Sequence, residues 1–419
     1  MDQAGPPRLS CDAGRVTGLY LTGVRPWGGE LSDVEIRDGR IAAVTAAGGP
    51  APEGVPLLAG EGRLLVPSFS DVHVHLDSTR LGLPWRPNDS PGGVWANMLH
   101  DRAHWRDGGP PMAERSTHML GLLIAHGVTR VRGYAQVDAD CELERLEAVV
   151  AAREAHAGRA DVEIIAFPQA GLLREPGVPS LMEAALRAGA GVMGGIDPCG
   201  VDGDPVRHLD IVFDLADRYG VPVDVHLHEP GELGLFSLGL IIERTRALDL
   251  RGRVTISHAF TLAHTPPPRL DEVLAEMAEL DISVATVAPP GRNTLPLTRL
   301  TEAGLRVGLG DDGQRDYWSP YGNADLLDRT WQLAFTNGFR NDHLVEHALA
   351  VGTWGGATVL DPSLPRLRGV DDRPGLAVGD PAELVLLDGE APAAAVQDRL
   401  PHRTVVHAGR VVAHDLALV

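Results

Sequence analysis

LLVPSFSDVHVHLD, residues 64–77, is the stretch of this chain that decides its fold. It begins as an apolar run typical of a buried strand and ends in polar side chains that can bind a metal. Residues two apart on a strand point to the same face, so His73 and His75 aim at one point. A His-Xaa-His pair alone is a weak signal, because most histidines lie on surfaces or make ordinary hydrogen bonds. The rest of the sequence must show whether a metal site is present.

The composition is that of a globular protein with an acidic surface. The 419 residues carry a formal net charge of -20, which argues against nucleic acids and anionic membranes as partners. No apolar stretch reaches the roughly 20 residues needed to span a bilayer, and the first residues lack a signal-peptide pattern. The three cysteines, Cys11, Cys141 and Cys199, form no Cys-Xaa-Xaa-Cys pair. We therefore expect a cytoplasmic protein.

The chain contains no lysine, because its 37 basic residues are all arginine. This composition excludes a Schiff-base lysine, a phosphate-loop lysine and a carboxylated lysine that bridges two metal ions. Any metal site in this chain therefore lacks a bridging lysine.

Both ends of the chain are rich in short strand patterns and turns. We expect strands at Val16–Thr22, Asp33–Arg37 and Arg40–Thr45 near the N-terminus, and at Ala382–Leu387, Arg403–His407 and Arg410–Ala413 near the C-terminus. Their common style favours one small β-sandwich domain, made of residues 1–65 and 374–419, over two unrelated tails. Residues 66–373 form the second predicted domain.

The middle of the chain alternates between strand and helix patterns. Eight apolar runs end in polar or small residues: Leu64–His75, Thr129–Gln136, Val162–Gln169, Gly191–Asp197, Pro222–Glu229, Val254–Ala259, Ile282–Ala288 and Leu305–Asp312. Helical patterns lie between them, at Pro111–His126, Glu142–Ala157, Ser180–Arg187, Pro205–Arg218, Leu235–Leu248 and Leu270–Leu280. Eight strand–helix repeats predict an α/β fold, a (β/α)8 TIM-like barrel with its helices outside. An open doubly wound sheet is the alternative, but it does not explain the polar endings.

Histidines and carboxylates gather at the ends of these runs, where barrel enzymes carry their active sites. His73 and His75 are followed by His226, His228 and Glu229 on the fifth run, His258 on the sixth, and Asp311 and Asp312 on the eighth. Their joint placement predicts one divalent metal ion, Zn²⁺, Fe²⁺ or Mn²⁺, with an open coordination position. Spacing alone does not decide whether His226 or His228 is the ligand, nor whether Asp311 or Asp312 is.

The chemistry expected of such a site is hydrolysis. A metal ion lowers the pKa of a bound water molecule. Asp312 can accept the proton of that water, and Glu229 can pass a proton to a substrate nitrogen. His258 can stabilise the attacking hydroxide. The predicted catalytic groups are therefore Glu229, His258 and Asp312.

The run VPSFSDVHVHLD, residues 66–77, resembles the first-strand motif of the amidohydrolase superfamily. Further matches resemble its cytosine deaminase branch, which also contains triazine and isopropylammelide hydrolases. They lie between about Leu64 and Asp361, and comprise Val131-Arg132, Ile165–Gln169, Gly194–Ile196, Asp224–His226 with Glu229, Val254–His258 and Asp316–Gly322.

The resemblance implies a role for each matching residue. It implies a single metal ion held by His73, His75, His226 and Asp312, which selects one residue from each ambiguous pair. Glu229 matches the acid that moves a proton, and His258 matches the histidine that contacts the hydroxide. Gln169 and Trp318 match residues that contact the substrate.

Three departures from the family pattern fall around the expected substrate and not around the metal. A second aspartate after the eighth strand is replaced by Gly313, and a histidine after the second strand is replaced by Tyr134. After the fourth strand, Ile-Pro-His is replaced by Ile196-Asp197-Pro198. We therefore assign Tyr134 and Gly313 to substrate binding, and we expect Gly313 to free volume for a ring other than cytosine.

The leading functional prediction is a metal-dependent deaminase of a cyclic amidine or aminated N-heterocycle that releases ammonia. One alternative opens a cyclic amide or removes an N-alkyl amine from a triazine-like ring. Another is a non-catalytic scaffold, which predicts missing ligands although none is missing. Family members often assemble, so a homo-oligomer is expected, and His100 and His104 are predicted to be surface or lid residues.

Overall fold

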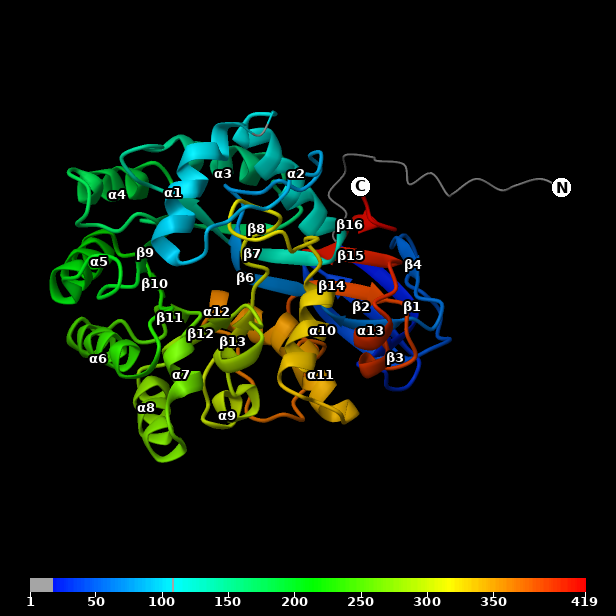
Figure 1. The fold of residues 1–419 in the computed structure, drawn as a ribbon. Coiled ribbons are helices and arrows are strands. Elements are labelled where there is room, and N and C mark those ends of the chain that lie inside the picture. Colours follow the sequence, from blue (N-terminus) through cyan, green and yellow to red (C-terminus); the bar gives the residue numbers. More distant parts are fainter. Residues whose placement is uncertain (1–17, 108) are drawn as a thin grey trace.

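The fold is described from a computed structural model, which defines residues 18–107 and 109–419 (Figure 1). Cys11 and the first two residues of the expected strand Val16–Thr22 lie outside this part of the chain. The protein has two parts. Figure 1 shows a barrel ringed by helices, and beside it a sheet in which blue strands from the N-terminal end lie next to red and orange strands from the C-terminal end.

Eight parallel strands form the barrel, in the order of the sequence. They are β6 (Phe69–His75), β7 (Val128–Gln136), β8 (Asp161–Phe167), β9 (Val192–Ile196), β10 (Val223–His226), β11 (Val254–Ser257), β12 (Ser283–Thr286) and β13 (Val307–Leu309). A parallel bridge between Val74 and Asp312 joins the end of the barrel to its first strand and nearly closes it. The predicted TIM-like barrel is confirmed.

The six helical patterns expected from the sequence are all helices. They are α2 (Met112–Ala125), α3 (Glu144–Ala155), α4 (Val178–Arg187), α5 (Pro205–Tyr219), α6 (Gly231–Ala247) and α8 (Pro267–Glu279). The structure adds α1 (Val94–His104), α7 (Phe260–His264), α9 (Leu297–Glu302), α10 (Leu326–Thr336), α11 (Asp342–Ala350), α12 (Gly356–Leu360) and α13 (Pro392–Asp398).

Helix α5 shows how the local sequence sets these elements. Its N-cap Asp204 accepts a hydrogen bond from the backbone N–H of Arg207, and Pro205 occupies the first helical position. Gly220 ends the helix in the left-handed conformation, with φ of 64°. Its buried residues include Leu209, Val212 and Phe213, which face the barrel and leave the charged side of the helix to solvent.

The second part is a mixed sheet built from both ends of the chain, as predicted. It contains β1 (Gly18–Pro26), β2 (Ser32–Arg37), β3 (Arg40–Ala46), β4 (Leu57–Ala59), β5 (Leu64–Pro67), β14 (Leu384–Leu387), β15 (Arg403–His407), β16 (Arg410–His414) and β17 (Ala417–Leu418). β5 lies between β1 and β14, so the first and last strands share one sheet. The exact boundaries of the two domains stay predictions.

The stretch at residues 64–77 connects the two parts. We expected one strand over Leu64–His75, but the structure divides it into β5 and β6 at Ser68. The N–H of Ser68 donates to the carbonyl of Glu383 in the terminal sheet, and the N–H of Phe69 donates to the carbonyl of Gly127 beside the barrel. Within the described residues, no helix is both long and apolar enough to cross a membrane.

Candidate metal centre

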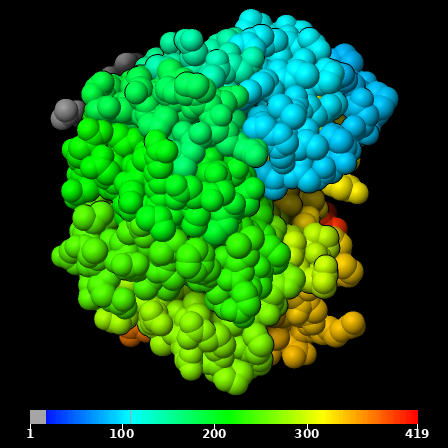
Figure 2. Space-filling model, turned by 60° about the vertical axis from the view of Figure 1, so that its left-hand side comes forward, coloured from blue at the N-terminus to red at the C-terminus, as the bar shows by residue number. Residues whose placement is uncertain are grey.

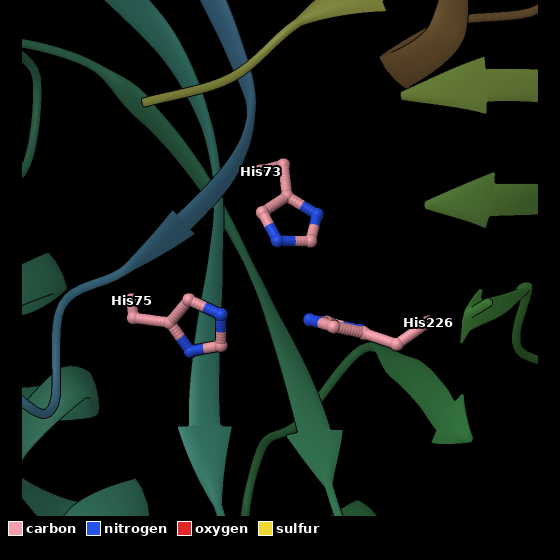
Figure 3. Close-up of side chains that lie close together, drawn as sticks. All are labelled: His73, His75 and His226. Atoms are coloured by element: carbon pink, nitrogen blue, oxygen red, sulfur yellow. The ribbon is translucent and has the colours of Figure 1, made fainter. Parts of the chain in front are cut away.

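Three imidazoles converge at the carboxyl ends of two barrel strands. His73 and His75 end β6, and His226 ends β10. Figure 3 shows their rings turned toward a common space. One nitrogen from each ring lies within 4.8 Å of the others. The alternation of side chains along β6 therefore aims both of its histidines at the same point.

Asp312 and His258 complete the cluster. Asp312 Oδ1 lies 3.5 Å from Nε2 of His73 and 3.5 Å from Nε2 of His75. The backbone N–H of Asp312 donates to the carbonyl of His73 at 2.8 Å, which fixes the loop after β13 against β6. His258 follows β11, and it forms with His73 and Asp312 a second group of possible ligands within 4.8 Å.

The donor atoms of this cluster fit a metal ion. Within the described part of the chain, Nε2 of His73 and both ring nitrogens of His226 are buried without a hydrogen-bond partner, as is Nδ1 of His258. Buried polar atoms of this kind are costly, and a bound cation would give several of them a partner. Burial lowers the pKa of His75 to about 3 and lowers the pKa of His226, so both imidazoles are neutral. Neutral imidazole is the form that binds metals.

The Asp312 carboxylate supplies the negative charge of the cluster. Burial alone raises its pKa, but the contacts with His73, His258 and His75 outweigh burial. The net effect places the pKa of Asp312 well below its ordinary value. Imidazole nitrogens and a charged carboxylate form a donor set that zinc, iron and manganese all accept.

A buried tyrosine orients the first histidine. The Tyr134 hydroxyl lies 3.0 Å from Nδ1 of His73, donates to Asp224 Oδ1 at 3.0 Å, and lies 2.9 Å from Ser257 Oγ. Because the hydroxyl hydrogen goes to Asp224, Nδ1–H of His73 donates to the tyrosine oxygen. This tautomer leaves the Nε2 lone pair of His73 free for a metal.

The structure separates the residue pairs that spacing left open. His228, two residues beyond the end of β10, turns to Asp197, with 2.8 Å between its Nδ1 and Oδ2 of Asp197. Asp311 lies away from the histidine cluster, 3.6 Å from Nε of Arg329, and its N–H donates to Asp71. His226 and Asp312 are thus the members of each pair that the fold brings to the cluster.

Strained backbone marks this end of the barrel. Several non-glycine residues that follow barrel strands have positive φ, among them Asp197 at 31°, His258 at 65° and Asp312 at 61°. Such conformations cost about 1 to 3 kcal/mol each and concentrate at functional sites. The strain is offset here by the contacts that hold each of these side chains beside the cluster.

A cavity of about 610 Å³ opens above the cluster. Its inner wall is polar and includes His75, His226, His228, His258 and Asp312. Its outer wall includes Trp331 and Phe335 of α10, whose rings stack 5.1 Å apart, together with polar residues of the same helix, among them Arg329 and Gln332. In Figure 2 the cyan segment that includes α1 and the yellow segment after β13 border a recess in the surface. The cavity is larger than a single heterocyclic ring requires.

Three of the four predicted substrate contacts line this cavity: Gln169, Gly313 and Trp318. Tyr134 does not, because it is fully buried beneath His73. The extra volume that we expected at Gly313 is not found either. A side chain at that position would collide with the carboxyl group of Asp316, which fills the space.

Glu229 does not line the cavity in this structure. Its Oε1 accepts hydrogen bonds from the backbone N–H groups of Cys199 and Gly200, and its Oε2 accepts one from the Ser237 hydroxyl. Burial raises the pKa of this carboxyl group. The side chain that does line the cavity beside it is His228, which the sequence analysis placed outside the set of catalytic groups.

Sequence reasoning also missed residues of α1 and α3 that reach the cavity. Asp101 and Arg145 line it and form a buried ion pair, with 2.5 Å between Oδ2 and Nη2. Their helices carry no motif that singles them out, so no pattern in the chain could have found them. His100 and His104 lie on the same helix α1, where His100 faces Asp89 at 3.2 Å.

Comparisons with known proteins agree with this geometry. The chain is 37% identical to N-isopropylammelide isopropylaminohydrolase from Burkholderia multivorans, whose structure superposes with a TM-score of 0.88 over 96% of this chain and 100% of that one. It is 28% identical to N-isopropylammelide isopropyl amidohydrolase from Pseudomonas sp. (strain ADP), over 86% of this chain and 88% of that protein.

A 5-methylcytosine deaminase from Klebsiella pneumoniae is 26% identical, with a TM-score of 0.79 over 94% of this chain and 98% of that one. Residues 108–413 match the amidohydrolase family. This match spans most of the chain, and it includes the strands that carry His226, His258 and Asp312. The chain therefore belongs to the amidohydrolase family.

Proposed function

We propose that this protein is a metal-dependent hydrolase that removes an alkylamine from an aminated N-heterocycle of the triazine kind. The sequence analysis ranked ammonia release first and amine removal second. We now place amine removal first because the chain is similar over its full length, at 37% identity, to N-isopropylammelide isopropylaminohydrolase. The chemistry, hydrolysis of a carbon–nitrogen bond outside a peptide, is common to both readings.

The cavity supports a substrate that is larger than a bare ring. A ring placed against Gln169 and Trp318 near the cluster leaves the outer wall for a substituent. Trp331 and Phe335 there offer an apolar surface against which an alkyl group can pack. Burial of an alkyl group against them contributes about 0.8 kcal/mol per methylene.

The metal in this proposal is one divalent ion held by His73, His75, His226 and Asp312. When bound, such an ion supplies a water molecule that loses its proton near neutral pH. Asp312 is placed to accept that proton, and His258 to stabilise the negative charge that develops beside it. Gln169 and Trp318 hold the ring.

Glu229 is proposed to carry a proton to the departing amine nitrogen. Its position three residues beyond the end of β10 and its raised pKa support this role. To reach the cavity, its carboxyl group must exchange its hydrogen bonds with Cys199, Gly200 and Ser237 for contacts with the substrate.

The test is product analysis with protein loaded in turn with zinc, iron or manganese. The panel contains N-alkylamino triazines, their unsubstituted amino counterparts, cytosine and 5-methylcytosine. Release of an alkylamine from the first group, at a higher kcat/KM than ammonia from the others, is the expected result. Alkylamino triazines left intact while cytosines release ammonia would replace the proposal with a deaminase.

Deamination is the second candidate, because the chain also resembles a 5-methylcytosine deaminase along 94% of its length. If metal-loaded protein released neither alkylamine nor ammonia, the panel would move to cyclic amides, and a ring-opened acid would be the product to look for.

A further inference from the structure

Asp316 is a buried carboxyl group on the wall of the cavity, and its hydrogen-bond donors are neutral. Oδ1 accepts hydrogen bonds from the backbone N–H groups of Trp318 and Ser319, at 2.8 and 2.9 Å. Oδ2 has only a long contact, 3.3 Å, with the hydroxyl of Ser78. Burial raises the pKa of Asp316 to about 7, so the group is poorly satisfied where it stands.

The two oxygens of this carboxyl group have different functions. Oδ1 closes a turn on its own backbone, which any aspartate or asparagine can do. Oδ2 points away from that turn and lies over Gly313. Asp316 and Gly313 both line the cavity, as do Gln169 and Trp318, so the Asp316 carboxyl group belongs to the same wall as the expected ring contacts.

Gly313 makes this position possible. A β-carbon there would overlap Oδ2 of Asp316, and its three nearest neighbours would all be atoms of the Asp316 carboxyl group. The glycine therefore leaves room for one specific side chain, which occupies it. A carboxyl group three residues farther along the chain thus occupies the space that a side chain at position 313 would need.

Building on the function proposed above, we propose that Asp316 selects the heterocycle: its Oδ2, held over Gly313, accepts a hydrogen bond from a ring N–H of the substrate. Rings in the lactam form carry such an N–H, and fully aromatic aminated rings without one do not. A ring without this N–H leaves the buried Oδ2 acceptor unpaired. Such a group therefore discriminates strongly between rings that carry the N–H and rings that lack it.

Asp316→Asn is the variant that tests this role. Asparagine keeps the carbonyl oxygen that closes the turn, and it replaces Oδ2 by an NH₂ group that cannot accept from a ring N–H. We expect KM for an N–H substrate to rise roughly 10-fold to 100-fold with a smaller change in kcat. Metal content and the thermal unfolding midpoint should not fall. Asp361→Asn is the matched control, because Asp361 closes an exposed turn on Ser363.

Methylated analogues of the substrate distinguish a contact with a ring N–H from a purely structural role of Asp316. The substrate is compared with analogues in which each ring N–H is methylated in turn. The wild type should lose about 10-fold or more in kcat/KM for one of these methylations, and D316N should lose much less for the same one. Asparagine has the size of aspartate, so any steric cost of the methyl group cancels between the two proteins.

Equal losses in the wild type and in D316N would overturn the assignment. If D316N failed to fold, Gly313→Ala would serve, because its methyl group must displace Oδ2 and should raise KM for the N–H substrate in the same way. An unchanged KM in that variant would also overturn it.

The assignment can fail separately from the proposed function. If the wild type is active and D316N behaves in the same way, only the role assigned to Asp316 is refuted, and the proposed function stands. If the wild type releases no amine, calorimetric binding of cyanuric acid and uracil to metal-loaded protein still tests the N–H contact. Weaker binding to D316N by about 10-fold would support it, and equal binding, or none to either protein, would refute it.

Discussion

Removal of the Tyr134 hydroxyl is the smallest change that tests the metal centre. Tyr134→Phe keeps the ring but deprives Nδ1 of His73 of its acceptor and Asp224 of a donor. Because groups behind metal-binding histidines fix their tautomer and orientation, we expect metal affinity to fall by about 10-fold to 100-fold. Competition with a chelator measures this affinity. Tyr219→Phe, which loses a hydroxyl contact with Glu183 on the outer surface, is the control and should bind metal normally.

Substitutions at Glu229 and His228 distinguish which of the two side chains transfers the proton. If Glu229 carries the proton, Glu229→Gln should keep the metal while kcat drops by a factor of roughly 100 or more. His228→Gln removes the side chain that already lines the cavity and breaks its contact with Asp197. A loss of turnover in His228→Gln alone, measured with equal metal content, would transfer the role to His228.

At the scale of elements, the sequence predicted the barrel better than the site. Burial on both faces makes parallel barrel strands continuous apolar runs, so all eight could be located. The four proposed ligands could be picked out as well, from strand ends and family motifs, and the fold brings them together, although their binding of a metal stays a prediction. The position of Asp316 over Gly313 and the exclusion of Tyr134 from the cavity could not, because both depend on how loops fold back in three dimensions.

A buried ion pair joins helix α1 to α3. Nη2 of Arg145 lies 2.5 Å from Asp101 Oδ2, and both side chains are 1% exposed. Asp101→Asn removes the carboxylate that contacts the buried arginine, so we expect the free energy of unfolding to fall by about 3 kcal/mol. Amide exchange in Val94–His104 should become faster than in the barrel strands. Asp89→Asn, which alters only the exposed contact of His100, should change neither.

The terminal sheet contains a pH-sensitive contact between His407 and Glu383, 2.8 Å apart. Burial alone lowers the pKa of His407, but the hydrogen bond and the charge of Glu383 outweigh it and raise the pKa above 6.5. The folded state thus holds a proton that the unfolded state releases, so the stabilisation is complete below pH 6.5 and is lost as the pH rises through the folded pKa.

His407→Gln should therefore lower the free energy of unfolding by about 1 to 2 kcal/mol at pH 6 and by less at pH 9. Denaturant unfolding at several pH values measures the difference. His402→Gln alters an exposed contact with Asp415 in the same sheet, and its effect should be near zero throughout. A loss in His407→Gln that did not change with pH would contradict the prediction.

At the scale of the whole molecule, Arg403 joins the two parts. This residue of β15 makes two 2.7 Å hydrogen bonds to Asp325, the N-cap of α10, and one to the carbonyl of His126. Arg403 is 1% exposed, so Arg403→Gln should cost about 3 to 5 kcal/mol in unfolding free energy. Arg399→Gln, whose partner Asp328 is half exposed, should cost less than about 1 kcal/mol.

Asp325 caps the helix that carries Trp331 and Phe335. Arg403→Gln should therefore also alter the position of these two side chains on the outer cavity wall. A rise in KM for alkylamino substrates, without a similar rise for small rings, would report this effect. An unchanged KM with lowered stability would confine the role of Arg403 to joining the sheet and the barrel.

The sharing of one sheet by both chain ends has a consequence for synthesis on the ribosome. β5 leaves the exit tunnel early, but its partner β14 emerges only after residues 68–383 have been made. Until then, the nascent chain presents an open strand edge, the kind of surface on which polypeptides aggregate. Every incomplete copy, whether from a stalled message or from proteolysis, keeps that edge. Translation speed and chaperone supply should thus govern the yield of this protein more than the stability of its finished barrel.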